Sequence, residues 1–285
     1  MKIRKKISTK INLASKLLFR NPAFLRNLLK PVIVNFINLI TLGRGITVNI
    51  GRQGEFKMSP QFYFSNWKNF GDRHNSGFLF CLEQSINKRI VLDIGAHIGL
   101  FSMPLSDRIS PGGKIYAFEP SEINRHYLKK HLELNDIKNV EVLPYLVGAK
   151  NNKKVEFYED QTQVNPMGGV ILSKYMKNDA IITHKQMVSL DAFCKDNDIQ
   201  PELIKIDVEG AEIDLLLGAK NVLLLHKPVI VLSLHPQYIE KMNQSLSDLR
   251  SYLEEVNFKC LTIDGKDNND FHQKECILLP SKNQK

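Results

Sequence analysis

The sequence predicts an α/β fold in which helices cover both faces of a mostly parallel sheet. From residue 77 onward, short apolar runs alternate with stretches of helical spacing. The apolar runs are continuous, as in strands that are buried on both faces. Near the end of the chain two such runs flank the polar stretch DGKDNND, which indicates a hairpin. We therefore expect a sheet whose last strand runs antiparallel to the others.

Seven strands are expected in this sheet. They cover residues 89–94, 114–118, 140–146, 204–208, 229–234, 258–263 and 276–279. The expected helices cover residues 77–86, 100–108, 121–135, 212–225 and 246–256. Residues 150–188 hold short alternating stretches in place of a helix, and we expect a small β-insertion or lid there.

Two regions are expected along the chain, a basic helical arm with a connector over residues 1–76 and a main domain over residues 77–285. Apolar residues recur at helical spacing between residues 11 and 42, which predicts one or two amphipathic helices, broken near Pro22 and Pro31. The connector should contain one or two short strands. No apolar run reaches the roughly 18 residues of a membrane span.

The positive charge of the chain belongs to the arm. The net charge is +9, and residues 1–54 contain eleven Lys and Arg residues and no Asp or Glu. The remaining residues carry 28 basic and 30 acidic side chains, a net of −2. Such an arm could pack on the main domain with solvated lysines, or residues 1–42 could lie on an anionic membrane surface. Disorder and nucleic-acid binding are further alternatives, although the acidic main domain makes a nucleic-acid partner unlikely.

Four widely spaced cysteines show no disulfide or metal pattern, and they favour a reducing compartment. We expect a cytoplasmic protein. It could also be attached peripherally to the inner face of the membrane. The histidines show no metal-ligand spacing either, and no metal is expected.

A glycine turn follows the first strand of the sheet in the stretch VLDIGAHIGL, residues 91–100. Gly95 allows the chain to turn sharply and a ligand to approach the backbone. Gly99 allows the next helix to pack closely. Between them Ala96 and His97 form the turn, and the start of the helix should offer free N–H groups to an anionic group.

Two cofactors compete for such a turn. A dinucleotide usually requires the pattern G-x-G-x-x-G, and here the middle glycine is missing. Asp93, just before the turn, should repel a diphosphate but attract the sulfonium and ammonium groups of S-adenosylmethionine. Glu119 closes the second strand and could accept the hydroxyl groups of a ribose, with Pro120 stiffening the chain behind it. The C-terminal hairpin also favours a methyltransferase over a dehydrogenase.

Three stretches resemble the FkbM family of S-adenosylmethionine-dependent methyltransferases. They are VLDIGAHIGLFS, AFEPSEINRHYLKKHLELN and SLDAFCKDNDIQPELIKIDVEGAEIDLLLGA, of which LIKIDVEGAE at 203–212 is the most specific. The resemblance covers about residues 77–279. It implies a Rossmann-like class I methyltransferase sheet and O-methyl transfer, often to sugars or other natural-product and glycan acceptors. An acidic residue that many such enzymes use to bind adenine is missing from residues 144–148.

Methyl transfer to a hydroxyl group requires a base that accepts the proton of the acceptor. The candidates are Asp207 and Glu209 at the end of the fourth strand and His235 at the end of the fifth. Asp207 could face the cofactor or the acceptor, and Glu209 could instead cap the next helix. Lys205 is most simply a buried partner of an acid.

We therefore expect an O-methyltransferase that acts on a small molecule or glycan near a membrane surface. Two alternatives keep the same fold: an RNA methyltransferase that uses the basic arm, and a catalytically inactive membrane-associated binding module. The oligomeric state and the acceptor are not encoded in any motif of the sequence.

Overall fold

The computed structural model describes residues 22–72, 75–159 and 181–281, with side chains from Leu29 onward. The chain divides into two compact units. The smaller unit comprises the residues up to Thr47 together with Lys57–Ser65, and the larger unit comprises Val48–Phe56 and the chain from Asn66 onward. The expected boundary at residue 76 stays a prediction.

The main helix of the smaller unit is α2 (Pro22–Ile40), which contacts the short 3₁₀ helix η1 (Pro60–Phe62). Strands β1 (Ile46–Asn49) and β2 (Glu55–Met58) form a two-stranded sheet, as expected for the connector. The expected break near Pro31 is wrong, because α2 continues through this residue. A proline removes one backbone hydrogen bond of a helix, and the other turns of α2 still form.

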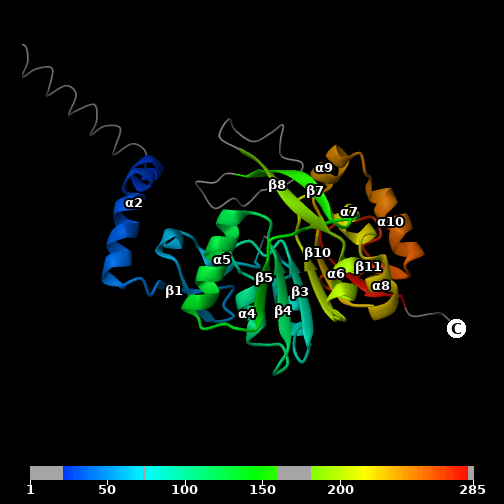
Figure 1. The fold of residues 1–285 in the computed structure, drawn as a ribbon, viewed down its shortest axis with the longest axis horizontal. Coiled ribbons are helices and arrows are strands. Elements are labelled where there is room, and N and C mark those ends of the chain that lie inside the picture. The colour runs from blue at the N-terminus through cyan, green and yellow to red at the C-terminus, as the bar shows by residue number, and fades with distance from the viewer. Residues whose placement is uncertain (1–21, 73–74, 160–180, 282–285) are drawn as a thin grey trace, which may run out of the picture. The chain divides into compact units, whose positions relative to one another are not determined.

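The larger unit is built on a seven-stranded sheet with the order β11-β12-β10-β9-β3-β4-β5 (Figure 1). Its strands are β3 (Ile90–Ile94), β4 (Lys114–Phe118), β5 (Val140–Leu143), β9 (Leu203–Ile206), β10 (Val229–Ser233), β11 (Phe258–Thr262) and β12 (Glu275–Pro280). β12 pairs antiparallel with both β10 and β11, and the pairs among β10, β9, β3, β4 and β5 are parallel. The predicted Rossmann-like sheet with its antiparallel last strand is confirmed.

Helices cover both faces of this sheet. They are α3 (Phe78–Gln84), α4 (Ser102–Ser106), α5 (Glu122–Leu134), α6 (Leu190–Asp196), α7 (Glu212–Leu217), α8 (Lys220–His226), α9 (Pro236–Ile239) and α10 (Leu246–Glu255). Leu92 and Ile94 of β3 belong to the core that includes residues of α6, α7, α8 and α10. Because side chains alternate along a strand, Asp93 points to the opposite face, where it meets Ser102 of α4.

The strand expected at residues 140–146 ends earlier. β5 stops at Leu143, Pro144 follows, and Leu146–Val147 form β6 in a second sheet. Proline has no N–H group for a ladder bond, so the chain leaves the large sheet at this point. The second sheet has the order β6-β8-β7, with β7 (Lys153–Glu159) and β8 (Ile181–Val188) antiparallel. This is the expected β-insertion, of which residues 160–180 lie outside the described residues.

The helix expected at residues 212–225 is two helices, α7 and α8, which meet at Gly218 and Ala219. A side chain at Gly218 would clash, since its Cβ would lie 2.1 Å from the carbonyl oxygen of Gly148. The carboxylate of Asp191 accepts hydrogen bonds from the N–H groups of Asn221 and Val222, at 3.0 and 2.9 Å. A side chain from α6 therefore caps the second helix and stabilises the break.

Candidate functional site

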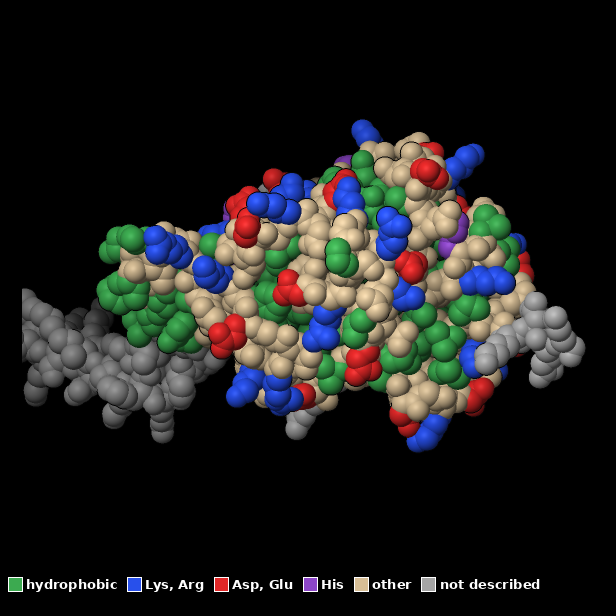
Figure 2. Space-filling view, turned by 90° about the horizontal axis from the view of Figure 1, so that it is seen from below, with side chains coloured by type: hydrophobic (Ala, Val, Ile, Leu, Met, Phe, Trp, Pro, Cys, Tyr) green, Lys and Arg blue, Asp and Glu red, His purple; other side chains and the backbone are tan. Residues whose placement is uncertain are grey.

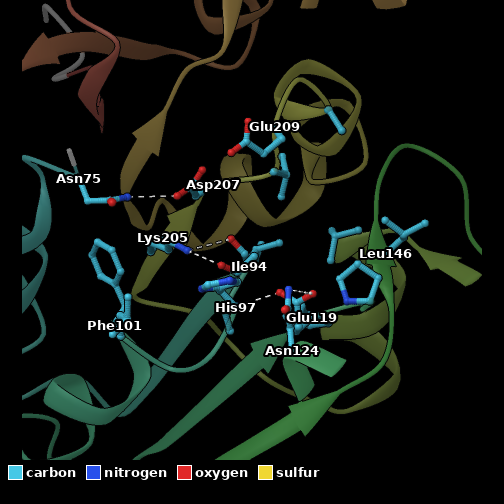
Figure 3. A pocket seen from close by; sticks show the side chains of 18 of the residues that line it. Asn75, Ile94, His97, Phe101, Glu119, Asn124, Leu146, Lys205, Asp207 and Glu209 are labelled. Atoms are coloured by element: carbon cyan, nitrogen blue, oxygen red, sulfur yellow. Dashed lines mark hydrogen bonds between the residues drawn. The ribbon is translucent and has the colours of Figure 1, made fainter. Parts of the chain in front are cut away.

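A cavity of about 350 Å³ opens at the carboxyl ends of β3, β4 and β9, and its walls belong to the larger unit (Figure 3). Glu119 and Asn124 lie at one end, Asn75 and Asp207 lie at the other, and Lys205 lies between them. This is the edge of a parallel sheet at which ligands commonly bind. The volume is within the range of small-molecule sites.

The turn after β3 is as tight as its glycines suggest. Gly95 has a φ of +79°, and a Cβ atom there would lie 1.9 Å from the carbonyl oxygen of Asp207. Gly99 has a φ of +95°, and a Cβ atom there would lie 2.7 Å from Cδ1 of Leu128 in α5. Both positions therefore require glycine, Gly95 for the close approach of β9 and Gly99 for the close approach of a helix.

Three N–H groups of this turn are bonded within the protein. Gly95 and Ala96 both donate to the carbonyl oxygen of Phe118, at 2.9 and 3.0 Å. The N–H of His97 donates to Oε2 of Glu119 at 2.8 Å. These bonds fix the turn against the end of β4.

The ring of His97 lines the cavity, although the sequence pointed to its backbone. Its φ is +52°, in the left-handed region. Burial lowers the pKa of His97 to about 4, so the imidazole is neutral at ordinary pH. Its Nε2 is buried and has no hydrogen-bond partner among the described residues, which leaves one polar atom of this ring for a ligand.

Asp93 does not line the cavity, which corrects the expectation that it faces a cofactor. Its side chain is fully buried, accepts a hydrogen bond from Ser102 Oγ at 2.6 Å and pairs with Lys205 Nζ at 3.1 Å. Lys205 also donates to the carbonyl oxygen of Gly95 at 2.7 Å. Lys205 is thus the buried partner of an acid, as predicted, and together the two residues hold the glycine turn in place.

Glu119 lies at the end of β4, with Pro120 beside it in the cavity wall. Burial raises the pKa of its carboxyl group, and hydrogen bonds from Ser121, His97 and Asn124 oppose this shift. These donors take up part of the capacity of the two oxygens, and a carboxylate can accept about four hydrogen bonds. Glu119 can therefore still accept hydroxyl groups of a ligand.

Several residues at this end of the cavity were not predicted from the sequence. Tyr145, Leu146 and Val147 form an apolar wall where the expected acidic residue is missing, and Phe157 of the β-insertion completes it. Asn124 supplies an amide close to this wall. No local pattern in the sequence marks Phe157, because its strand, β7, is distant along the chain from the glycine turn.

Asp207 and Glu209 both line the opposite end of the cavity. Asn75 donates from Nδ2 to Oδ2 of Asp207 at 3.1 Å. Glu209 has a φ of +52° and does not cap α7, whose N-cap is Ala211. The amide of Asn75 comes from the connector, where no pattern in the sequence pointed to a function.

His235 lies behind these two acids and is not part of the cavity wall. Its Nε2 is 3.5 Å from Oε2 of Glu209 and 3.8 Å from Oδ1 of Asp207. Its Nδ1 lies 2.7 Å from Oε1 of Glu212, which is fully buried and also accepts from the N–H of Gly210 at 2.9 Å. Glu212 was missed as a functional residue, although it is the last acid of the stretch LIKIDVEGAE.

The charges of this cluster are strongly coupled. Burial raises the pKa of Glu209 to about 7, which the charge on His235 opposes and the carboxylates of Asp207 and Glu212 reinforce. Burial by itself would lower the pKa of His235, but the hydrogen bond to Glu212 and the three surrounding carboxylates raise it to about 9. At neutral pH His235 is therefore a cation, and Glu209 is close to its midpoint.

The same side chains could also hold a metal ion. One donor atom each of Asp207, Glu209 and His235 lies within 4.8 Å of the other two. Such a set suits a divalent cation, and the bond from Glu212 to the other ring nitrogen is typical of a histidine ligand. A protonated His235 satisfies the same three carboxylates with no metal.

An aromatic wall faces the polar end of the cavity. Trp67, Phe70 and Phe101 all line it. Phe70 contacts both other rings edge-on, with centroid distances of 6.5 Å to Trp67 and 5.6 Å to Phe101. The cavity thus combines apolar ring surfaces with carboxylate and amide groups.

Comparison with protein families gives one match. The family model described as "Methyltransferase FkbM domain" matches residues 93–260, more than half of the chain. Among curated proteins, the AMB antimetabolite synthetase AmbE of Pseudomonas aeruginosa is 26% identical over 181 residues. That match covers 51% of this chain and 8% of the synthetase, so the chain spans only a small part of this relative.

Two solved structures are among those similar to this chain. One is the methyltransferase FkbM of Methylobacillus flagellatus KT, 20% identical, with a TM-score of 0.42 over 67% of this chain and 43% of that one. The other is the cofactor-bound Rv0187 from MTB, 14% identical, with a TM-score of 0.44 over 74% of this chain and 81% of that one.

Proposed function

The chain belongs to the FkbM methyltransferase family, and from that premise we propose that it transfers the methyl group of S-adenosylmethionine to a hydroxyl group of an acceptor. S-adenosylmethionine supplies a methyl group on a sulfonium, which is already a good leaving group. The residues of the protein then have to bind this donor, align the acceptor and accept one proton.

The main support for the proposal is the charge of the cavity wall. Among the described residues, three carboxylates line it, those of Glu119, Asp207 and Glu209, and Lys205 is the one cation in the wall. The ammonium of Lys205 is already engaged with Asp93 and the Gly95 carbonyl. A wall with excess negative charge favours a ligand that carries a sulfonium and an ammonium over one that carries a diphosphate. The sequence analysis expected Asp93 to repel a diphosphate. We assign this repulsion instead to Glu119, Asp207 and Glu209.

The residues present fit such a donor. Glu119 would accept the ribose hydroxyl groups, and the apolar wall of Tyr145, Leu146 and Val147 would face the adenine. Asn124 offers a side-chain amide on this side of the cavity. Asp207 and Glu209 would face the cationic part of the donor and the acceptor.

Glu209 is the best proton acceptor in the cavity. It lines the wall, whereas His235 lies behind it, and a pKa of about 7 suits a general base at neutral pH. The imidazolium of His235 would stabilise the carboxylates around it, and Glu212 would fix its orientation through Nδ1. His235 then acts as a positioning residue and not as the base.

We propose a sugar or a related polyhydroxyl compound as the acceptor. The aromatic wall of Trp67, Phe70 and Phe101 suits the C–H face of a sugar ring. Asn75, Asp207 and Glu209 supply acceptors for its hydroxyl groups. This combination supports a sugar more than an RNA, because an RNA-binding face would be basic, whereas residues 55–285 carry a net charge of −2.

Calorimetric titration with S-adenosylmethionine and with NAD tests the proposed donor. We expect binding of S-adenosylmethionine by the wild-type chain, and a loss of about tenfold or more in affinity for Glu119→Ala, since about 1.5–3 kcal/mol is typical of hydrogen bonds to a charged group. Glu133→Ala is the matched control, because Glu133 is an exposed residue of α5 outside the cavity wall. Tighter binding of NAD than of S-adenosylmethionine would contradict the proposal.

Incubation with methyl-labelled S-adenosylmethionine and pools of glycans, lipids and RNA tests the acceptor. Label is expected in the glycan pool and should depend on Glu209. Label in RNA would favour the RNA methyltransferase instead. Donor binding with no label in any pool would favour the inactive binding module.

A further inference from the structure

The helix α2 carries an exposed apolar face. Its members are Leu29 (42% exposed), Val32 (65%), Phe36 (61%), Leu39 (71%) and Ile40 (61%). They follow one another at intervals of three, four, three and one residues, so they share one side of the helix. On the other side Ile37 is only 8% exposed. Figure 2 shows hydrophobic side chains gathered on this part of the surface, with Lys or Arg side chains among them.

Exposed apolar residues occur on every protein surface, but a continuous helical face of five is unusual for one that meets only water. Among the described helices none is long and apolar enough to cross a membrane. Asn35 and Asn38 interrupt the apolar residues on the remaining sides of α2, which is amphipathic as a result. A helix of this kind suits the interface between headgroups and acyl chains.

The basic charge of the N-terminal sequence indicates what kind of partner covers the apolar face of α2. Residues 1–54 contain eleven Lys and Arg residues and no Asp or Glu. Lys30 lies on α2 itself, and Arg44 is exposed just after it. Basic residues next to an apolar helical face match an anionic lipid surface, because each Lys or Arg is attracted to the negative headgroups.

We propose that the apolar face of α2 lies on an anionic membrane surface, with Lys30 and Arg44 against the lipid headgroups. This would place the chain at a membrane as a peripheral protein. The proposal does not depend on the proposed methyl transfer, because α2 belongs to the smaller unit and the cavity to the larger one.

Co-sedimentation of the full chain with vesicles tests the proposal. Vesicles of phosphatidylcholine with phosphatidylglycerol should bind at least about tenfold more protein than phosphatidylcholine alone. Raising the salt from about 0.1 M to about 1 M should weaken this binding, because the Debye length falls from about 10 to 3 Å.

Phe36→Asp should reduce the affinity for anionic vesicles by about tenfold or more, since it replaces an aromatic ring of the proposed membrane-facing side by a negative charge. Asn38→Asp is the matched control, because it adds the same charge to the same helix away from the apolar face, and it should bind within about twofold to threefold of wild type. Calorimetry with S-adenosylmethionine should give the same affinity for both variants, which shows that the cavity is intact.

Two results would overturn the proposal. One is equal sedimentation of wild type and Phe36→Asp with anionic vesicles. The other is a dimer in analytical ultracentrifugation that Phe36→Asp dissociates, with no vesicle binding by the wild-type chain, because the face would then be an interface between two copies.

Discussion

Glu209 combines three unusual properties in one residue. Its backbone lies in the left-handed region with a φ of +52°, its side chain lines the cavity, and its pKa is raised to about 7. A left-handed conformation costs a non-glycine residue about 1–2 kcal/mol, so neighbouring bonds must hold it in place. Glu212 provides such a bond by accepting the N–H of Gly210. The strained backbone at Glu209 directs a carboxylate into the cavity.

Activity should therefore depend on the protonation of Glu209. Below pH 7 its carboxyl group is protonated and cannot accept another proton, so kcat/KM should rise with pH through about 7. Glu209→Gln should lower kcat by about 100-fold or more and remove this limb of the pH profile. Initial rates measured between pH 5 and pH 9, about two units on either side of neutrality, give the result. An unchanged limb in Glu209→Gln would rule out Glu209 as the base.

His235 provides an independent check of the same cluster. The charge of His235 lowers the pKa of Glu209, so His235→Asn should raise that pKa and move the limb to higher pH. If His235 were itself the base, the limb would disappear in this variant. The two variants together separate a positioning role from a direct one.

At the level of single residues, the sequence could predict which side chains stand at the ends of strands, but not which way they point. Asp93 lies near the end of β3 and Asp207 directly follows β9, yet Asp93 points into the protein toward Lys205 while Asp207 lines the cavity. The difference depends on the pairing of β3 with β9, which places Asp93 beside Lys205. Asn75 could not be predicted, because its partner Asp207 is distant along the chain.

At the level of elements, the contact between the turn after β3 and the end of β9 should be the least tolerant point of the fold. Gly95→Ala would place a Cβ atom 1.9 Å from the carbonyl oxygen of Asp207 in a backbone conformation with positive φ. We expect a loss of about 3 kcal/mol in the free energy of unfolding, from overpacking and backbone strain together.

Gly265→Ala is the matched control for this substitution. Gly265 has a φ of +84°, close to the +79° of Gly95, but no atom lies within 4 Å of the position of its Cβ. The control should lose only about 1 kcal/mol from backbone strain. Urea unfolding of the three proteins measures the difference, and equal losses would show that the contact with Asp207 does not limit the fold.

The helices and strands also show why most elements, but not all of their ends, could be predicted from the sequence. Continuous apolar runs bounded by glycine or polar residues marked all seven strands of the large sheet. The errors came at Pro144 and Gly218, where the local pattern continues but the chain changes direction. At Pro144 the missing N–H ends the ladder, and at Gly218 contact with Gly148 divides the helix. Only the division at Gly218 depends on a residue that is distant along the chain, Gly148.

At the level of the whole molecule, the cavity is assembled from segments that no single motif contains. Gly95 and Glu119 come from the recognisable strand ends, whereas Trp67 comes from the connector and Phe157 from the β-insertion. The sequence could therefore predict the glycine turn and the strand end that line one part of the cavity, but not the shape of the rest. Each segment contributes to one cavity within the larger unit, so a bound ligand should stabilise that unit as a whole.

Trp67 is the only tryptophan of the chain and lines the cavity, so its fluorescence should report both ligand binding and unfolding of the larger unit. S-adenosylmethionine at a hundred times its Kd should raise the free energy of unfolding by about 2.7 kcal/mol, because only the folded cavity binds it. Urea unfolding followed by this fluorescence measures the gain. NAD at the same concentration should give a smaller gain, since the described part of the cavity wall carries three carboxylates and one cation. An equal gain from NAD, or none from S-adenosylmethionine, would show that the cavity is not selective for a cationic donor.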